Sequence, residues 1–204
     1  MINTTAWNRL RYTAYAPLYD LLAARTFCKP RRTALGQVDW ELGMRVLLVG
    51  AGTGLDLPYL PHEIETHLTD LTPAMIKRAR ERAEKAQRDV ECRVMDAAAL
   101  DYPDEYFDVV VMHLILAVMP NPQQGLAEAY RVLKGDGQLC VMDKFQPDAQ
   151  PTGLGRRALN AFTSFIATDI TRQATPLIQN AGFTIRRDEP VLMNGLFRAL
   201  LATK

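Results

Sequence analysis

The sequence is poor in cysteine and in long apolar runs. Its three cysteines are an odd number among 204 residues, and no two of them have C-x-x-C spacing. This pattern indicates neither a disulfide framework nor a zinc or other metal site, and it fits a reducing cytoplasm. The longest apolar stretch, residues 109–119, is interrupted by His113 and is too short to span a bilayer. Any membrane contact would therefore be peripheral.

The sequence also has almost no net charge and no targeting signal at its N-terminus. The formal net charge is +1, with 48% hydrophobic and 23% charged residues. These values are typical of an ordinary globular protein with no overall attraction to nucleic acid. The N-terminus lacks the charged-then-apolar pattern of a signal peptide, so we expect a cytoplasmic protein, with any membrane contact at the inner face. Residues 1–38 are an exception, since they hold six basic residues against the single acid Asp20.

What the sequence does contain is a regular alternation of strand-like and helix-like segments from residue 45 onward. Strands are expected at 45–49, 65–69, 91–95, 107–112, 138–143, 185–192 and 197–202. Helices are expected at 73–88, 123–133, 156–167 and 174–181, with a turn at 134–137. This order predicts a single α/β domain at residues 39–204: a Rossmann-like, seven-stranded, mostly parallel sheet with helices on both faces and an antiparallel C-terminal hairpin.

The most informative motif is a run of three glycines after the first strand. Gly50, Gly52 and Gly54 occupy alternate positions, where the first permits a tight turn and the others let a ligand approach the backbone. A dinucleotide fingerprint would place its third glycine at the position of Leu55. The observed spacing favours the nucleoside and amino-acid cradle of S-adenosylmethionine (SAM). A dinucleotide-dependent oxidoreductase is the poorer alternative.

Residues at the ends of the next strands complete a candidate cofactor site. Asp70 can accept hydrogen bonds from ribose hydroxyls, or it can simply help to begin the helix at Pro73. Asp96 can accept from an adenine amino group or open a loop, and His113 either faces the cleft or is structural. The predicted cofactor-binding residues are Gly50, Ala51, Gly52, Thr53, Gly54, Asp70, Leu71, Met75, Asp96, Ala97 and His113.

These residues resemble the motifs of class I SAM-dependent methyltransferases. Residues 46–55 are similar to motif I, and Asp70, Asp96 and the segments 107–110 and 131–137 match later landmarks in order and spacing. Within the family, the chain is most similar to the soluble bacterial phosphatidylethanolamine N-methyltransferases and the related quinone methyltransferases. The matching stretches are Tyr15–Asp20, Arg31–Arg32, Thr53–Pro58, Ala181–Phe183 and Asn194–Phe197.

The resemblance implies SAM as the cofactor and in-line attack of an acceptor atom on its methyl group. The amine of phosphatidylethanolamine is the leading acceptor, and a quinone or a small soluble molecule is the alternative. An ethanolamine ammonium must first lose a proton. The candidate catalytic residues are Tyr15, Tyr19, His113 and Asp143, and candidates for a lipid phosphate contact are Arg156, Arg157 and Arg172. A non-catalytic SAM-binding module at the membrane is a third interpretation.

The arm at residues 1–38 admits three roles. It interleaves aromatic residues with basic ones, which suits the headgroup region of an anionic bilayer. Tyr15 and Tyr19 are four residues apart and can equally form a lid over the cofactor. Plain packing of a helix with snorkelling arginines is the remaining alternative. We expect no nucleic-acid partner.

Overall fold

The computed structural model describes residues 24–146 and 172–204. Their seven strands form one sheet in the order β3-β2-β1-β4-β5-β7-β6. The strands are β1 (Arg45–Val49), β2 (Glu65–Asp70), β3 (Val90–Val94), β4 (Phe107–His113), β5 (Leu133–Lys144), β6 (Thr184–Leu192) and β7 (Phe197–Thr203). Strands β1 to β5 are parallel, and β7 is antiparallel to both of its neighbours. The predicted fold class is confirmed.

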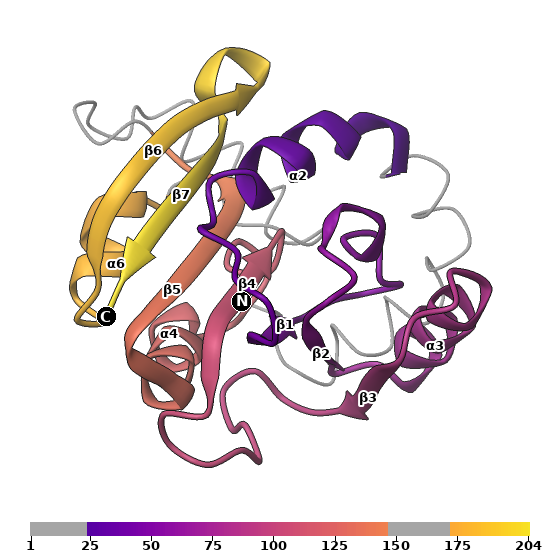
Figure 1. Cartoon of the computed structure of the whole chain (residues 1–204). Helices are drawn as coiled ribbons and strands as arrows, with labels where there is room; N and C mark the ends of the chain where they lie inside the picture. Colours follow the sequence, from indigo (N-terminus) through magenta and orange to yellow (C-terminus); the bar gives the residue numbers. More distant parts are fainter. Residues whose placement is uncertain (1–23, 147–171) are drawn as a thin grey trace.

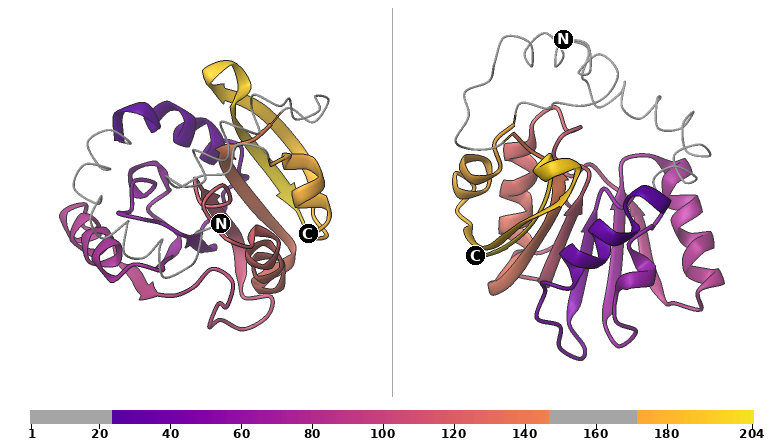
Figure 2. Two further views of the ribbon diagram at one scale, coloured as in Figure 1. Left: turned by 180° about the vertical axis from the view of Figure 1, so that it is seen from behind. Right: turned by 90° about the horizontal axis from the view of Figure 1, so that it is seen from above.

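Helices cover both faces of this sheet (Figures 1 and 2). They are α2 (Cys28–Leu35), α3 (Pro73–Lys85), α4 (Pro122–Val132) and α6 (Ala174–Gln179), with short 3-10 turns η1 (Leu57–Tyr59) and η2 (Met193–Gly195). Successive strand residues point to opposite faces. Val46 and Leu48 accordingly pack with α2 and α3, whereas Leu47 and Val49 share the other core cluster with α4 and α6.

Helix α3 shows how the sequence sets these boundaries. It begins with Pro73 at its first position, and Met75, Ile76, Ala79 and Ala83 form its buried stripe as the periodicity predicts. It ends at Lys85 instead of near residue 88. On its basic face, the Arg82 guanidinium donates hydrogen bonds to the carbonyl and hydroxyl oxygens of Thr53 at 2.8 and 3.2 Å.

The turn expected at residues 134–137 lies inside strand β5. Leu133 pairs with Phe107 and Gln138 pairs with Val109, so the four intervening residues bulge opposite one residue of β4. A Cβ at Gly137 would come within 3.0 Å of the Asp108 carbonyl oxygen. The glycine is therefore needed for this close approach, and the strand starts directly after α4.

The C-terminal hairpin is confirmed. Strands β6 and β7 pair antiparallel and are joined through η2, where Asn194 and Gly195 have φ values of 50° and 87°. Both values lie in the left-handed region that asparagine and glycine tolerate. The predicted helical segment at 156–167, and the residues Tyr15, Tyr19, Arg156 and Arg157, lie outside the described part of the chain.

Candidate active site

A cavity of about 430 Å³ lies beyond the carboxyl ends of β1 to β4. From β1 the chain adds β2 and β3 on one side of the sheet and then β4 and β5 on the other. Open α/β sheets bind ligands at this switch point between β1 and β4. The cavity is lined by Arg31, Gly50, Ala51, Gly52, Thr53, Leu55, Asp70, Leu71, Thr72, Met75, Met95, Asp96, Ala97, Ala98, Ala99, His113, Leu114, Ile115, Val118, Met119, Pro120, Asn121 and Gln124. Of the predicted cofactor-binding residues, all except Gly54 are in this set.

The three glycines shape the wall nearest β1. Gly50, Gly52 and Gly54 have φ values of 64°, 56° and 76°, in the region where only glycine avoids a Cβ penalty. A Cβ at Gly50 would lie 2.1 Å from Cδ1 of Ile115, whereas one at Gly52 would meet nothing within 4 Å. Gly54 instead faces α3, where its Cβ would touch Ala79 at 3.4 Å. The motif therefore leaves open space beside the backbone of Gly52, and at Gly54 it allows α3 to pack close to the loop.

Asp70 ties this glycine loop to the end of β2. Its carboxylate accepts hydrogen bonds from the Gly52 amide at 3.0 Å and from the Thr72 amide at 2.8 Å. Burial raises the pKa of Asp70, and these two amides only partly offset it. The contact with Thr72, next to Pro73, is the helix-start role considered above. The ribose contact remains a prediction for a residue that lines the cavity.

The end of β3 supplies the opposite wall. Asp96 accepts a hydrogen bond from the amide of Ala98 at 3.0 Å, which shapes a short turn whose alanines line the cavity. Met75 and Leu71 add apolar surface. Exposed glycine backbone, two carboxylates and an apolar lining fit the amino acid, ribose and base of SAM, so the residues present are suited to this cofactor.

His113 lines the cavity, but its ring nitrogens are engaged elsewhere. Nδ1 lies 2.7 Å from Oδ1 of Asp56, and Nε2 lies 3.6 Å from the Cys140 sulfur. The other carboxylate oxygen of Asp56 forms an ion pair with the Arg31 guanidinium. Burial raises the pKa of Asp56, but Arg31 and His113 outweigh burial and hold this pKa well below its usual range. The three residues form a buried chain of polar contacts, which we call the inner cluster.

Asp143 was predicted to lie near the cleft as a base, but it is not among the described residues that line the cavity. Its carboxylate is buried and accepts hydrogen bonds from the amides of Ala117 at 3.0 Å and Lys144 at 2.8 Å. Burial raises the pKa of Asp143. Arg172 donates to the Met119 carbonyl oxygen at 2.9 Å from the other side. Both residues therefore hold the loop that forms the apolar cavity wall.

Three features of this site were not predicted from the sequence. Arg31 was counted with the basic arm, yet it is buried on α2 and lines the cavity. Asp56 lay inside the stretch Thr53–Pro58 and was given no role, because nothing in the local sequence separates a buried acid from a solvent-facing one. Residues 114–119 belong to the longest apolar stretch of the sequence, but nothing in that stretch indicated that they form a wall of the cavity.

Comparison with known proteins agrees with this geometry. A sequence profile described as a methyltransferase domain matches residues 47–141. The phosphatidylethanolamine N-methyltransferase of Cereibacter sphaeroides is 31% identical over 185 residues, which cover 90% of this chain and 91% of that protein. The ubiquinone/menaquinone biosynthesis C-methyltransferase of a Ruegeria species is 38% identical over 115 residues, 52% of this chain and 46% of that one.

Solved structures give the same fold. The [4+2]-cyclase SpnF superposes with a TM-score of 0.84 at 19% identity, covering 98% of this chain and 97% of that one. A SAM-dependent methyltransferase from Aquifex aeolicus has a TM-score of 0.70 at 20% identity, covering 93% and 97%. Sequence likeness, sheet order and cavity together define the class. The chain belongs to the class I SAM-dependent methyltransferases, and SAM is its cofactor.

Proposed function

We propose that this methyltransferase acts on the amine of phosphatidylethanolamine. The observation that carries the proposal is the extent of the likeness to the Cereibacter enzyme, which spans nine-tenths of both chains. The quinone methyltransferases of Ruegeria and of Deinococcus radiodurans align over 52% and 68% of this chain, and over 46% and 60% of their own. The likeness to the quinone methyltransferases thus covers less of this chain and less of those proteins.

The shape of the cavity supports an amphiphilic acceptor. One wall is formed by Leu114, Ile115, Val118 and Met119, which are apolar and follow the central strand β4. Such a wall suits an acyl chain or a prenyl tail better than a strongly polar metabolite. None of the described helices combines the length and apolar composition of a membrane span. We propose a peripheral lipid contact, with the basic and aromatic residues of 1–38 other than the buried Arg31 as its surface.

When bound, SAM would supply a methyl group attached to a sulfonium, and the thioether that remains after transfer is a good leaving group. The chain's own task is to align the acceptor and exclude water, and orientation can lower a barrier by roughly 7–11 kcal/mol. Both ring nitrogens of His113 contact protein groups, so neither one points to the place of an acceptor. Tyr15 and Tyr19 remain the proposed residues for receiving or relaying the ammonium proton.

The test is methyl transfer from methyl-labelled SAM to vesicles that contain phosphatidylethanolamine in an anionic lipid background. Matched vesicles would carry a demethylated prenyl quinone in the same background, and lipid products would be separated by mass. We expect the label in the ethanolamine headgroup. Label in the quinone alone would replace this proposal with quinone C-methylation, the second candidate, which the 38% identity to the Ruegeria enzyme favours. Label in neither would exclude both acceptors.

A further inference from the structure

Three large apolar side chains are exposed among the described residues. Leu42 is 83% exposed, Met193 61% and Val94 48%. Leu42 precedes β1 at the amino edge of the sheet, and Val94 ends the outermost strand β3. Met193 lies in η2, and we call residues 192–196 the hairpin tip. A single exposed methionine is ordinary by itself. The backbone and the surroundings of Met193 are not.

The backbone of the hairpin tip is left-handed at three successive residues. The φ values of Met193, Asn194 and Gly195 are 50°, 50° and 87°. Asparagine and glycine tolerate this region, whereas a long side chain such as that of methionine adopts it at a cost in free energy. The sequence thus places an apolar side chain where asparagine or glycine would suit the backbone better. Such strain at an exposed position points to a role outside the core.

The hairpin tip lies at the edge of the sheet that holds the cofactor cavity. Strands β5 and β6 are both antiparallel to β7, so they run in the same direction and end at the same edge. The Leu196 carbonyl oxygen accepts a hydrogen bond from the Phe145 amide at 2.9 Å, which ties the tip to the chain directly after β5. Strand β5 pairs with β4, and the residues after β4 form the apolar wall of the cavity.

The start of α2 adds basic side chains beside the hairpin tip. The ring of Phe27 lies 5.1 Å from that of Phe197, the first residue after the tip. The side chains of Arg25, Lys29 and Arg32 near this contact are exposed, and residues 24–38 contain no aspartate or glutamate. Helix α2 and the tip lie together at the top of Figure 1.

The acids of β6 do not cancel this basic surface. Asp188 forms an ion pair with Arg198 at 2.6 Å, and Glu189 is exposed. The three exposed basic residues of the α2 segment therefore outnumber the one exposed acid of β6. An apolar tip flanked by cations matches the boundary between anionic headgroups and acyl chains.

We propose that the hairpin tip inserts Met193 into an anionic lipid bilayer while Arg25 and Lys29 contact lipid phosphates. An unbranched, flexible methionine suits a disordered apolar medium. The inference rests on the proposed function, since it presumes an acceptor that resides in a lipid layer, and it adds a contact outside residues 1–38. It turns the edge of the cavity toward the bilayer, so that the headgroup of an acceptor enters while its acyl chains stay in lipid.

The test is co-sedimentation of the full-length protein with phosphatidylcholine vesicles that contain or lack phosphatidylglycerol. Neither SAM nor phosphatidylethanolamine is present, so the result does not depend on the acceptor. We expect the wild-type protein to bind the anionic vesicles more tightly. Met193→Asn removes the apolar side chain and suits a φ of 50°, so the fold should be retained. The variant should bind anionic vesicles roughly 10- to 100-fold more weakly.

The opposite edge of the sheet provides the matched control. Leu42→Asn removes an even more exposed apolar side chain and should leave vesicle binding unchanged. Arg25→Gln and Lys29→Gln should each weaken binding to the anionic vesicles by about fivefold and affect binding to phosphatidylcholine alone much less. Circular dichroism and the Kd for SAM should match the wild type in all four variants, because none of these residues lines the cavity.

Wild-type affinity in Met193→Asn would overturn the inference, as would an equal loss in Leu42→Asn. A wild-type protein that binds both kinds of vesicle equally, or neither, would also overturn it. The labelled-methyl assay fails separately. Vesicle binding that depends on Met193, without methylation of phosphatidylethanolamine, would support the membrane surface and refute the proposed acceptor. Methylation of phosphatidylethanolamine in detergent micelles, with vesicle binding that does not depend on Met193, would refute the surface alone.

Discussion

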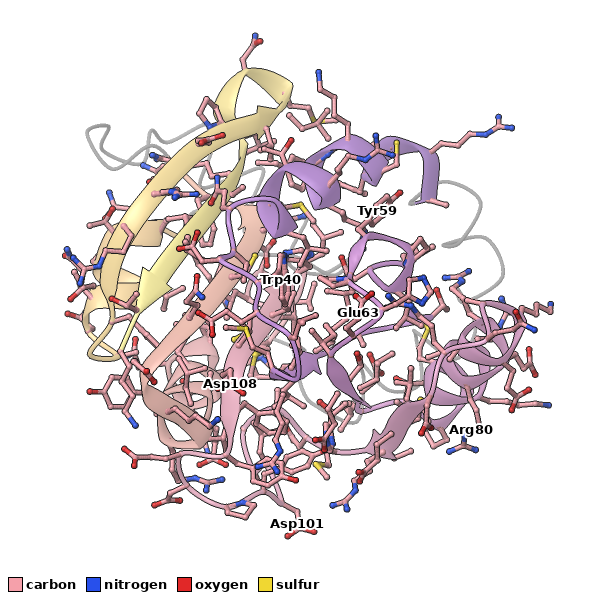
Figure 3. All side chains as sticks on the ribbon, viewed as in Figure 1. Trp40, Tyr59, Glu63, Arg80, Asp101 and Asp108 are labelled. Carbon is pink, nitrogen blue, oxygen red and sulfur yellow. The ribbon has the colours of Figure 1, made fainter. Side chains whose placement is uncertain are left out.

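Two clusters of charged residues and histidine on the same sheet are built from similar residues but differ in their exposure to solvent. The inner cluster joins Arg31, Asp56 and His113, whose side chains are 6%, 4% and 1% exposed. The outer cluster surrounds His67 with Arg45, Glu65, Glu91 and Arg93 on β1 to β3, and these four side chains are 43–49% exposed. Nearby, Asp101 and Arg80 project from the surface (Figure 3).

The difference between the clusters lies in the solvent around them. Water screens the outer pairs, so each one gains little over its solvated state. The inner pairs have lost that solvation, and removing one partner leaves a buried charge without compensation. Only the inner cluster adjoins the cofactor cavity. The comparison indicates that charge at the carboxyl edge of the sheet positions the site, whereas charge on the outer strands mainly keeps the surface polar.

The largest expected effect is on the inner cluster. Asp56→Ala should lower the free energy of unfolding by about 3–5 kcal/mol, because Arg31 and His113 would both lose their carboxylate. Chemical denaturation followed by circular dichroism would measure this. Asp56→Asn, which keeps an acceptor, should cost clearly less. Equal and small losses for both variants would contradict the view that this carboxylate is held as a buried ion.

The pH dependence of the same cluster has a defined sign. The pKa of Asp56 is lower in the folded protein than in the unfolded chain, where it is about 3.9. Its stabilising contribution is therefore complete above about pH 5 and is lost as the pH falls toward the folded value. Asp70 and Asp143 have raised pKa values and act in the opposite sense.

The difference in unfolding free energy between the wild type and Asp56→Asn isolates this contribution. It should shrink as the pH falls from about 5 to about 3. Denaturation of both proteins across this range would measure it. A difference that grows toward acid pH would mean that Asp56 is protonated in the folded state.

The glycine loop should show an intermediate effect. Gly50→Ala places a Cβ in contact with Ile115 at a φ of 64°, so we expect a loss of stability of about 1–3 kcal/mol and at least a tenfold weaker Kd for SAM. Gly43→Ala is the matched control, because Gly43 has a φ of 75° but no atom within 4 Å of its Cβ. The control should cost about 1 kcal/mol of strain and leave SAM binding unchanged.

Much of this fold could be predicted from local patterns. The apolar runs at 46–49 and 107–112 gave two central strands, and Pro73 with its apolar stripe gave the start and buried face of α3. The position of the candidate cavity was predictable for the same reason, since the ends of parallel strands meet at one edge. The chain order of strand ends was enough to place Gly50, Gly52, Asp70 and Asp96 around one cavity.

What the sequence did not reveal are contacts between distant segments. Arg31 and Asp56 are 25 residues apart, and Asp56 and His113 are 57 apart, so no local periodicity links them. The bulge at residues 134–137 has the same origin, because Gly137 lies close to the carbonyl oxygen of Asp108 in β4, a residue distant in the sequence. Charged residues in particular gave no indication of burial, since the partner that permits burial lies elsewhere in the chain.

The smallest expected effect concerns the outer cluster. Arg93 and Glu91 form an ion pair at 2.5 Å, with both side chains more than two-fifths exposed. A double-mutant cycle with Arg93→Gln and Glu91→Gln should give a coupling free energy of about 0.2–1 kcal/mol, falling further in concentrated salt. The Kd for SAM should not change in any of these variants. Coupling several times larger and insensitive to salt would mean that the outer pairs are held as rigidly as the inner ones. Burial would then not explain the contrast between the two clusters.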